Sequence, residues 1–164
     1  RAQAKPKDYP VECFYSHKLK ELKNVDLVIL AVSDNAIQKI SYELPQTTAL
    51  VVHTSGSIPL LSLNKKLRRG VCYPLQTFSK HSLVDFSQIP FCLETENAKD
   101  TKLIEQALAQ ISRKIYILTS DQRSKLHLNA VMVNNFTNHI YALSYKLCKK
   151  HQIPFDILHP STTC

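Results

Sequence analysis

The stretch that decides the fold is Asp26-Leu-Val-Ile-Leu-Ala-Val32, a nearly continuous apolar run, and Ala49-Leu-Val-Val-His53 repeats the pattern further along the chain. Runs of this kind are typical of strands that are covered on both faces of a parallel sheet. Between them, Asn35–Leu44 carries apolar residues at helical spacing, and Ser33 or Asp34 can cap that helix. The two runs therefore predict a strand-helix-strand unit with parallel strands.

Strands and helices continue to alternate after this unit. We expect a short helix at Ile58–Leu67, strands at Gly70–Tyr73, Pro90–Glu94 and Lys114–Leu118, an amphipathic helix at Ala98–Ser112, and a polar loop at Gln76–Asp85. This alternation predicts an α/β fold with a parallel sheet.

The pattern changes after Ser120. Asp121–His151 contains neither proline nor glycine and predicts one helix of about 30 residues, capped by Ser120 or Asp121. Pro154 ends it, and Phe155–Leu158 begins another turn or helix. We therefore expect two parts, residues 1–119 and residues 120–164.

The composition excludes several classes of protein. The five cysteines are scattered and form no CxxC pair, which disfavours a disulfide framework and a zinc site and favours a cytoplasmic location. No apolar run reaches the ~18 residues that a membrane span needs. Lys and Arg number 21 against 13 Asp and Glu, a net charge of +8 that suits an anionic partner. The basic residues are spread over helix ends and turns without interleaved aromatics, so nucleic-acid binding is disfavoured.

Polar residues follow both of the first two strands. Because ligands bind beyond the carboxyl ends of parallel strands, these residues are the candidates for cofactor binding: Ala31, Val32, Ser33, Asp34, His53, Thr54, Ser55 and Gly56. Small residues let a flat ring approach the backbone, and hydroxyls bond ribose or carboxamide groups. The alternative is that both segments are only helix caps and turns. His53 is either a base at a strand end or a structural residue.

The long helix carries a second polar set, His127, Asn134, Asn135, Asn138 and His139. Asn134 and Asn138 are four residues apart, as are Asn135 and His139, so each pair is expected on one face. Apolar neighbours predict that this stretch is largely buried, in an interhelical polar network or against a substrate or nicotinamide. His127 and His139 lie roughly 18 Å apart along a helix and cannot share a metal ion. We expect no metal site.

Several motifs resemble one family closely. They are Val51-Val-His-Thr-Ser-Gly-Ser-Ile-Pro59, Gly70-Val-Cys-Tyr-Pro-Leu-Gln-Thr-Phe-Ser79, Ile89-Pro-Phe91, Leu126-His127 and Asn134-Asn-Phe-Thr-Asn-His139. Over Asp26–Leu158 the chain resembles the Rossmann-like NADP oxidoreductases that carry a helical C-terminal domain of uncharacterised function, distant relatives of pyrroline-5-carboxylate reductase and the β-hydroxyacid dehydrogenases. The resemblance implies a partial Rossmann-type sheet, NADP or NAD across the two strand ends, and a homodimer through the C-terminal helices.

The chain departs from this family in three ways. Family members open with a strand, a Gly-x-Gly turn and a helix, and this chain is expected to lack that phosphate-binding unit, which makes residues 1–119 a truncated dinucleotide-binding domain. If Asn135 matches the asparagine of the β-hydroxyacid dehydrogenases, then Val131 stands where those enzymes carry a catalytic lysine. The chain also ends where family members continue with further helices, so residues 120–164 are expected to be an incomplete all-α dimerisation domain.

Three hypotheses follow. The first is an oxidoreductase that moves hydride between NADP(H) or NAD(H) and a small carbonyl or imine substrate, with His127, Asn135 and His139 at the reacting groups. The second is a non-catalytic module for nucleotide sensing or dimerisation, which the missing lysine favours. The third, nucleic-acid binding, has only the net charge in its support.

Overall fold

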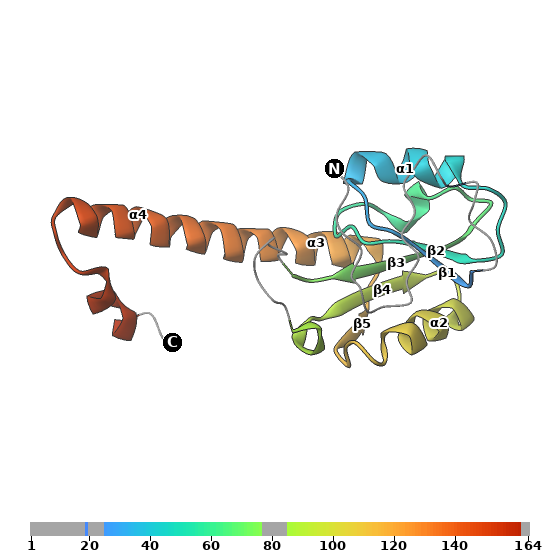
Figure 1. Cartoon of the computed structure of the whole chain (residues 1–164). Helices are drawn as coiled ribbons and strands as arrows, with labels where there is room; N and C mark the ends of the chain where they lie inside the picture. The colour runs from blue at the N-terminus through green and yellow to red at the C-terminus, as the bar shows by residue number, and fades with distance from the viewer. Residues whose placement is uncertain (1–18, 20–24, 77–84, 162–164) are drawn as a thin grey trace.

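The computed structural model describes residue 19, residues 25–76 and residues 85–161; the predicted polar loop at Gln76–Asp85 lies for the most part outside them. A single sheet runs through the first part of the chain (Figure 1). Its five strands lie side by side in sequence order: β1 (Leu27–Leu30), β2 (Leu50–His53), β3 (Arg68–Pro74), β4 (Phe91–Thr95) and β5 (Ile115–Ile117).

The strand directions confirm the α/β class and add one reversal. β1 pairs with β2, β2 with β3, and β4 with β5 in parallel, but β3 and β4 pair antiparallel, with Tyr73 opposite Cys92. The sheet is therefore mixed and not purely parallel. No helix was predicted between these two strands, and an antiparallel neighbour needs no helical crossover to be reached.

The core lies on both faces of β2, which is buried along its whole length. Val51 packs on one side with Ile37 of α1 (Asp34–Glu43), and Val52 on the other with Ile104 of α2 (Ala98–Leu108). Successive side chains of a strand point to opposite faces, so a continuous apolar run serves both layers. Figure 1 shows α1 and α2 on opposite faces of the sheet.

The helix predicted at Ile58–Leu67 is wrong. Only a 3-10 turn forms there, at Leu60–Ser62. The backbone groups that a helix would pair internally have partners from elsewhere, because the Leu60 amide donates to Ser120 Oγ at 3.0 Å and the Ile58 carbonyl accepts from the Arg123 guanidinium at 2.6 Å.

The long C-terminal helix is confirmed in its extent. It consists of α3 (Ser120–Val131), a π-helical turn (Met132–Phe136) and α4 (Thr137–Lys150), and α4 projects away from the sheet (Figure 1). Gln152, at φ 55°, takes the left-handed conformation that closes many helices, and Pro154 follows. Within the described residues, no helix is both long and apolar enough to cross a membrane.

The helix begins one residue earlier than predicted, with Thr119 as its cap. The Thr119 hydroxyl accepts from the Gln122 amide at 3.3 Å, and the Gln122 side chain accepts from the Thr119 amide at 2.9 Å. This reciprocal pair is a capping box. It satisfies two backbone donors that would otherwise lack partners at the helix start.

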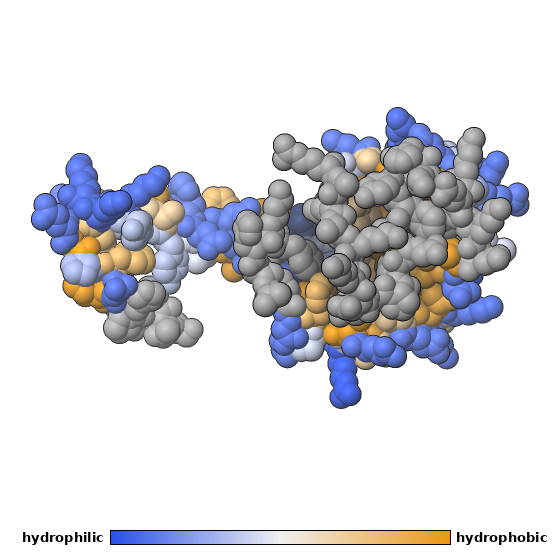
Figure 2. All heavy atoms as spheres, viewed as in Figure 1, coloured by the Kyte–Doolittle hydropathy of each residue, from blue (hydrophilic) through white to orange (hydrophobic). Residues whose placement is uncertain are grey.

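The predicted burial of the asparagine-bearing stretch is wrong for the chain described. Its four apolar neighbours are substantially exposed: Val131 37%, Met132 47%, Val133 67% and Phe136 61%. The cause is the direction of the helix, which leaves the sheet behind before it reaches these residues (Figure 1). Apolar surface also appears on the projecting part in Figure 2.

Replacing Thr119 by alanine should lower the free energy of unfolding by about 1 kcal/mol, because the helix start loses its capping hydroxyl. Urea denaturation followed by circular dichroism measures this change. Ser124→Ala, at an exposed position of the same helix, is the matched control and should be nearly neutral. Equal losses for the two variants would contradict a capping role for Thr119.

Candidate functional site

The carboxyl ends of β1 and β2 lie side by side, as predicted. Leu30 and His53 are partners in the parallel register. Beyond the strands, Ser57 Oγ donates to Asp34 Oδ2 at 2.7 Å and joins the two following segments. The first segment, Ala31–Asp34, is exposed throughout, and the Ser33 side chain makes no capping hydrogen bond to α1. This edge therefore presents backbone and one uncommitted hydroxyl to solvent.

The second segment folds upon itself. His53 Nδ1 accepts from the Ser55 amide at 3.2 Å, and Ser55 Oγ accepts from the amides of Ser57 and Ile58 at 3.2 and 3.1 Å. His53, Ser55 and Gly56 are buried, while Thr54 is half-buried. The buried side chains thus hold the loop in shape, and in this chain Thr54 is the one of the four predicted residues here that is more open to a ligand.

His53 is neutral across the physiological range. Burial, followed by the positive charge of Arg123, lowers the pKa of His53 from 6.5 to about 4. Its side chain has no exposed surface. A neutral ring with Nδ1 engaged as an acceptor carries its proton on Nε2. His53 therefore acts on the site through the loop that it shapes.

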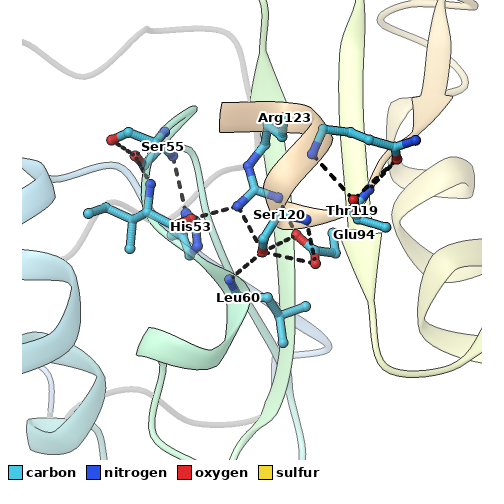
Figure 3. A network of polar contacts seen from close by, with 10 residues as sticks. His53, Ser55, Leu60, Glu94, Thr119, Ser120 and Arg123 are labelled. Atoms are coloured by element: carbon cyan, nitrogen blue, oxygen red, sulfur yellow. Dashed lines mark hydrogen bonds and ion pairs between the residues drawn. The ribbon is translucent and has the colours of Figure 1, made fainter. Parts of the chain in front are cut away.

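A fully buried arginine ties the long helix to the sheet (Figure 3). Arg123 forms an ion pair with Glu94 of β4 and donates to the Ile58 carbonyl beyond the β2 loop. Ser120 adds to the network, since its amide and hydroxyl donate to Glu94 at 2.7 to 2.9 Å while its Oγ accepts from the Leu60 amide. Each charge is paired or hydrogen-bonded, which burial requires.

His127 lies one helical turn beyond Arg123 and meets Tyr73 from the end of β3. The Tyr73 hydroxyl and His127 Nδ1 are 2.9 Å apart, and the two rings meet edge to face at 5.7 Å between centroids. Both rings press on Gly56, where a Cβ atom would come within 2.6 Å of His127 Nδ1 and 2.8 Å of Tyr73 Cζ. Only glycine fits under this pair, so the two rings close directly over the β2 loop.

Burial raises the pKa of the Tyr73 phenol, with a smaller contribution from Cys92, while the charge of Arg123 acts in the opposite direction. The phenol therefore keeps its proton at neutral pH. A protonated tyrosine beside a half-buried imidazole at a ligand-facing loop is an arrangement suited to proton donation and hydrogen bonding.

The other predicted residues of the long helix lie elsewhere. Asn134, Asn135, Asn138 and His139 are all exposed, in the π-helical turn and at the start of α4. The helix does cover the β2 loop, but with His127 and not with its asparagines. Since π-helical backbone places residues five apart above one another, the expected four-residue pairing does not hold across this turn. The roles predicted for Asn135 and His139 stay predictions.

Three residues of this region were not singled out from the sequence: Tyr73, Glu94 and Arg123. Tyr73 lies inside the motif Gly70–Ser79, which was the available signal for it. Nothing local marks Arg123 as buried, because its partners come from β4 and from the segment after β2. In the part of the chain that the structure describes, no group of three or more histidine, cysteine or acidic residues could hold a metal ion.

The low pKa of His53 predicts a dependence of stability on pH. Between pH 6.5 and about 4 the unfolded chain binds a proton at this histidine and the folded chain does not. Stability should therefore fall with decreasing pH across this window, by up to about 3 kcal/mol more in the wild type than in His53→Gln. Urea denaturation at stepwise pH measures it.

The matched control for this prediction is His151→Gln, at an exposed histidine, whose curve should follow the wild type. Parallel curves for the wild type and His53→Gln would show that His53 titrates normally, against the prediction.

Comparison with known proteins places these residues in a family context. Residues 89–162 match the family model described as a domain of unknown function, DUF2520. A search of curated proteins found no match. Among solved structures, one from Bacteroides fragilis, titled a "putative NADP oxidoreductase", is 39% identical with a TM-score of 0.72 and is matched over 87% of this chain and 57% of its own.

Two further structures extend the comparison. A protein from Thermotoga maritima is 25% identical with a TM-score of 0.69, over 86% of this chain and 56% of its own. A structure from Jannaschia sp., titled a "putative oxidoreductase", shares the fold at 12% identity and a TM-score of 0.58, over 80% of this chain and 57% of its own. The chain thus spans little more than half the length of the structures that it matches. The resemblance found from the motifs is confirmed: through residues 89–162 the chain belongs to the DUF2520 proteins, on the Rossmann-like fold of these structures.

Proposed function

We propose that the chain is part of an NAD(P)-dependent oxidoreductase that reduces or oxidises a small carbonyl or imine substrate. The observation that carries the proposal is the closure of the Tyr73–His127 pair over Gly56, in the loop that Ser57 joins to the exposed end of β1. A ring system, a hydroxyl-bearing strand end and a proton-donating pair are thereby gathered at one edge of a Rossmann-like sheet. The names of the similar structures support a nicotinamide cofactor.

The exposed strand end fits one half of a dinucleotide better than the other. Asp34, in the first turn of α1, carries a negative charge and accepts from Ser57, so this point repels phosphate but offers an acceptor for sugar hydroxyls. Ala31–Ser33 leave backbone and one hydroxyl exposed beside it. We therefore assign the nicotinamide-ribose end to these residues, with Thr54 on the facing loop. The pyrophosphate would need donors from another segment.

A bound nicotinamide supplies or accepts the hydride. The chain's own groups then orient the substrate and manage its proton, and His127 is the group placed for this. Asn135 and His139, on the exposed part of the helix, are proposed to contact substrate where a second copy packs against that helix. A protein that binds the dinucleotide but turns over neither carbonyls nor imines would instead be a sensing or dimerisation module.

Titration of the protein with NADPH and NADH, followed by dihydronicotinamide fluorescence, tests the cofactor. Ser33→Glu should weaken binding at least about tenfold, because a second carboxylate beside Asp34 repels the phosphates. Gln38→Glu adds the same charge at an exposed position further along α1 and should leave binding nearly unchanged. The absence of saturable binding at millimolar dinucleotide would overturn the proposal.

We further propose that the projecting helix pairs with the same helix of a second copy. Four apolar residues of this region follow one another at intervals of four, three and four, and all are more than half exposed: Phe136 61%, Ile140 61%, Leu143 52% and Leu147 61%. That spacing is typical of a seam that packs against another helix. Tyr141 and Tyr145 instead contact Phe155 edge to face, at 6.4 and 5.5 Å. The chain's own C-terminal turn therefore covers a different side and leaves the seam bare.

Charge favours an antiparallel arrangement of the two copies. Lys146, Lys149 and Lys150 gather at the far end of α4. Parallel helices would bring these like charges together, whereas antiparallel helices keep them apart. An antiparallel pair also closes with two-fold symmetry and exposes no further seam.

Leu143→Lys should convert a dimer into a monomer of 18.7 kDa, because a charge replaces an apolar side chain in the seam. Size-exclusion chromatography with light scattering measures the mass. Lys146→Glu, an exposed position outside the seam, should remain dimeric. A wild-type protein that is monomeric at high micromolar concentration would refute the pairing.

A further inference from the structure

The Tyr73–His127 hydrogen bond decides which nitrogen of His127 carries hydrogen. The phenol keeps its proton, so with a neutral imidazole the Tyr73 hydroxyl donates to Nδ1 and the ring hydrogen resides on Nε2. With a charged imidazole, Nδ1–H donates to the phenol oxygen and Nε2 again carries hydrogen. Nε2 is therefore a hydrogen-bond donor in both protonation states.

This donor has no partner within the protein. Nδ1 is engaged by Tyr73, and no hydrogen bond to Nε2 exists among the described residues. The imidazole is half-buried, and Nε2 is absent from the buried polar atoms without partners, which distinguishes it from Nε2 of His53. It is therefore accessible at the loop where the nicotinamide end of the cofactor is placed.

We propose that Tyr73 is a positioning residue that holds His127 as a permanent Nε2–H donor, and that the substrate reduced at this site is an aldehyde or ketone rather than an imine. The inference rests on the proposed oxidoreductase function and narrows its substrate class. A carbonyl oxygen accepts a hydrogen bond and becomes more negative during reduction, which a fixed donor stabilises. A protonated imine has no lone pair for such a donor and already carries a positive charge, so the same group opposes it.

The step balances as follows. The carbonyl carbon gains a C–H bond from the hydride of the dihydronicotinamide, the π electrons of the C=O bond move to oxygen, and oxygen takes the proton from Nε2 of His127. The imidazole regains a proton from solvent. The carbonyl is reduced to an alcohol, and the dinucleotide is oxidised.

Side-chain nitrogen NMR of the histidines tests the hydrogen position directly and needs no substrate. In the wild type His127 should be the Nε2–H form, and Tyr73→Phe should give a mixture of the two neutral forms. Tyr116→Phe, at an exposed tyrosine of β5, is the matched control and should leave the spectrum unchanged. The Nδ1–H form in the wild type would overturn the inference.

Turnover of small aldehydes, 2-oxo acids and cyclic imines with NADPH tests the substrate class. Carbonyl reduction should exceed imine reduction, and His127→Leu should lower kcat for carbonyls about 100-fold. His127→Gln, which keeps an amide N–H near the same place, should retain more activity. Faster imine reduction, or turnover of neither class, would overturn the inference, and NADPH titration of the wild type shows separately whether the proposed function falls with it.

Discussion

One buried ion pair holds the described part of the molecule together. Arg123 has no contact with solvent, and it reaches Glu94 of β4 and the Ile58 carbonyl beyond β2 at the same time. Removing either charge of such a pair leaves the other unpaired in a medium of low dielectric, which is costly. The pair thus fixes where α3 begins on the sheet. His127 is four residues further along this helix, so its place above Gly56 follows from the anchoring of Arg123.

The same charge explains why the surrounding groups stay neutral. A second cation on His53 would lie in the field of Arg123 without water to screen it, and the pKa of His53 is correspondingly low at about 4. Tyr73 keeps its proton chiefly through burial, against the pull of that charge. The region therefore combines one compensated ion pair with neutral donors and acceptors. Such a set can hold a hydrogen-bonding geometry without rearranging as the pH changes near neutrality.

The sequence was most informative where a single element decides the outcome. The apolar runs around Val28 and Val51 identify two strands that are buried together, because burial on both faces requires an unbroken run. The turn at the end of the long helix follows in the same way from Pro154. Contacts between distant segments left no comparable signal. The Tyr73–His127 pair joins two elements that nothing in the spacing relates, and Arg123 resembles any surface arginine until Glu94 is placed beside it. The exposure of Val133 and Phe136 escaped prediction because an apolar stretch does not reveal which chain covers it.

The π-helical turn at Met132–Phe136 has a geometric effect on everything beyond it. An α-helix rotates by about 100° per residue, and a π-helical turn takes in one residue more than an ordinary turn does. A helical wheel drawn straight through the long helix would therefore misorient the side chains of α4 by roughly this angle relative to those of α3. The direction in which His127 looks and the direction in which the seam of Ile140 and Leu143 looks are consequently set independently. A single inserted or deleted residue within the turn would swing one face around the other while leaving both helices intact.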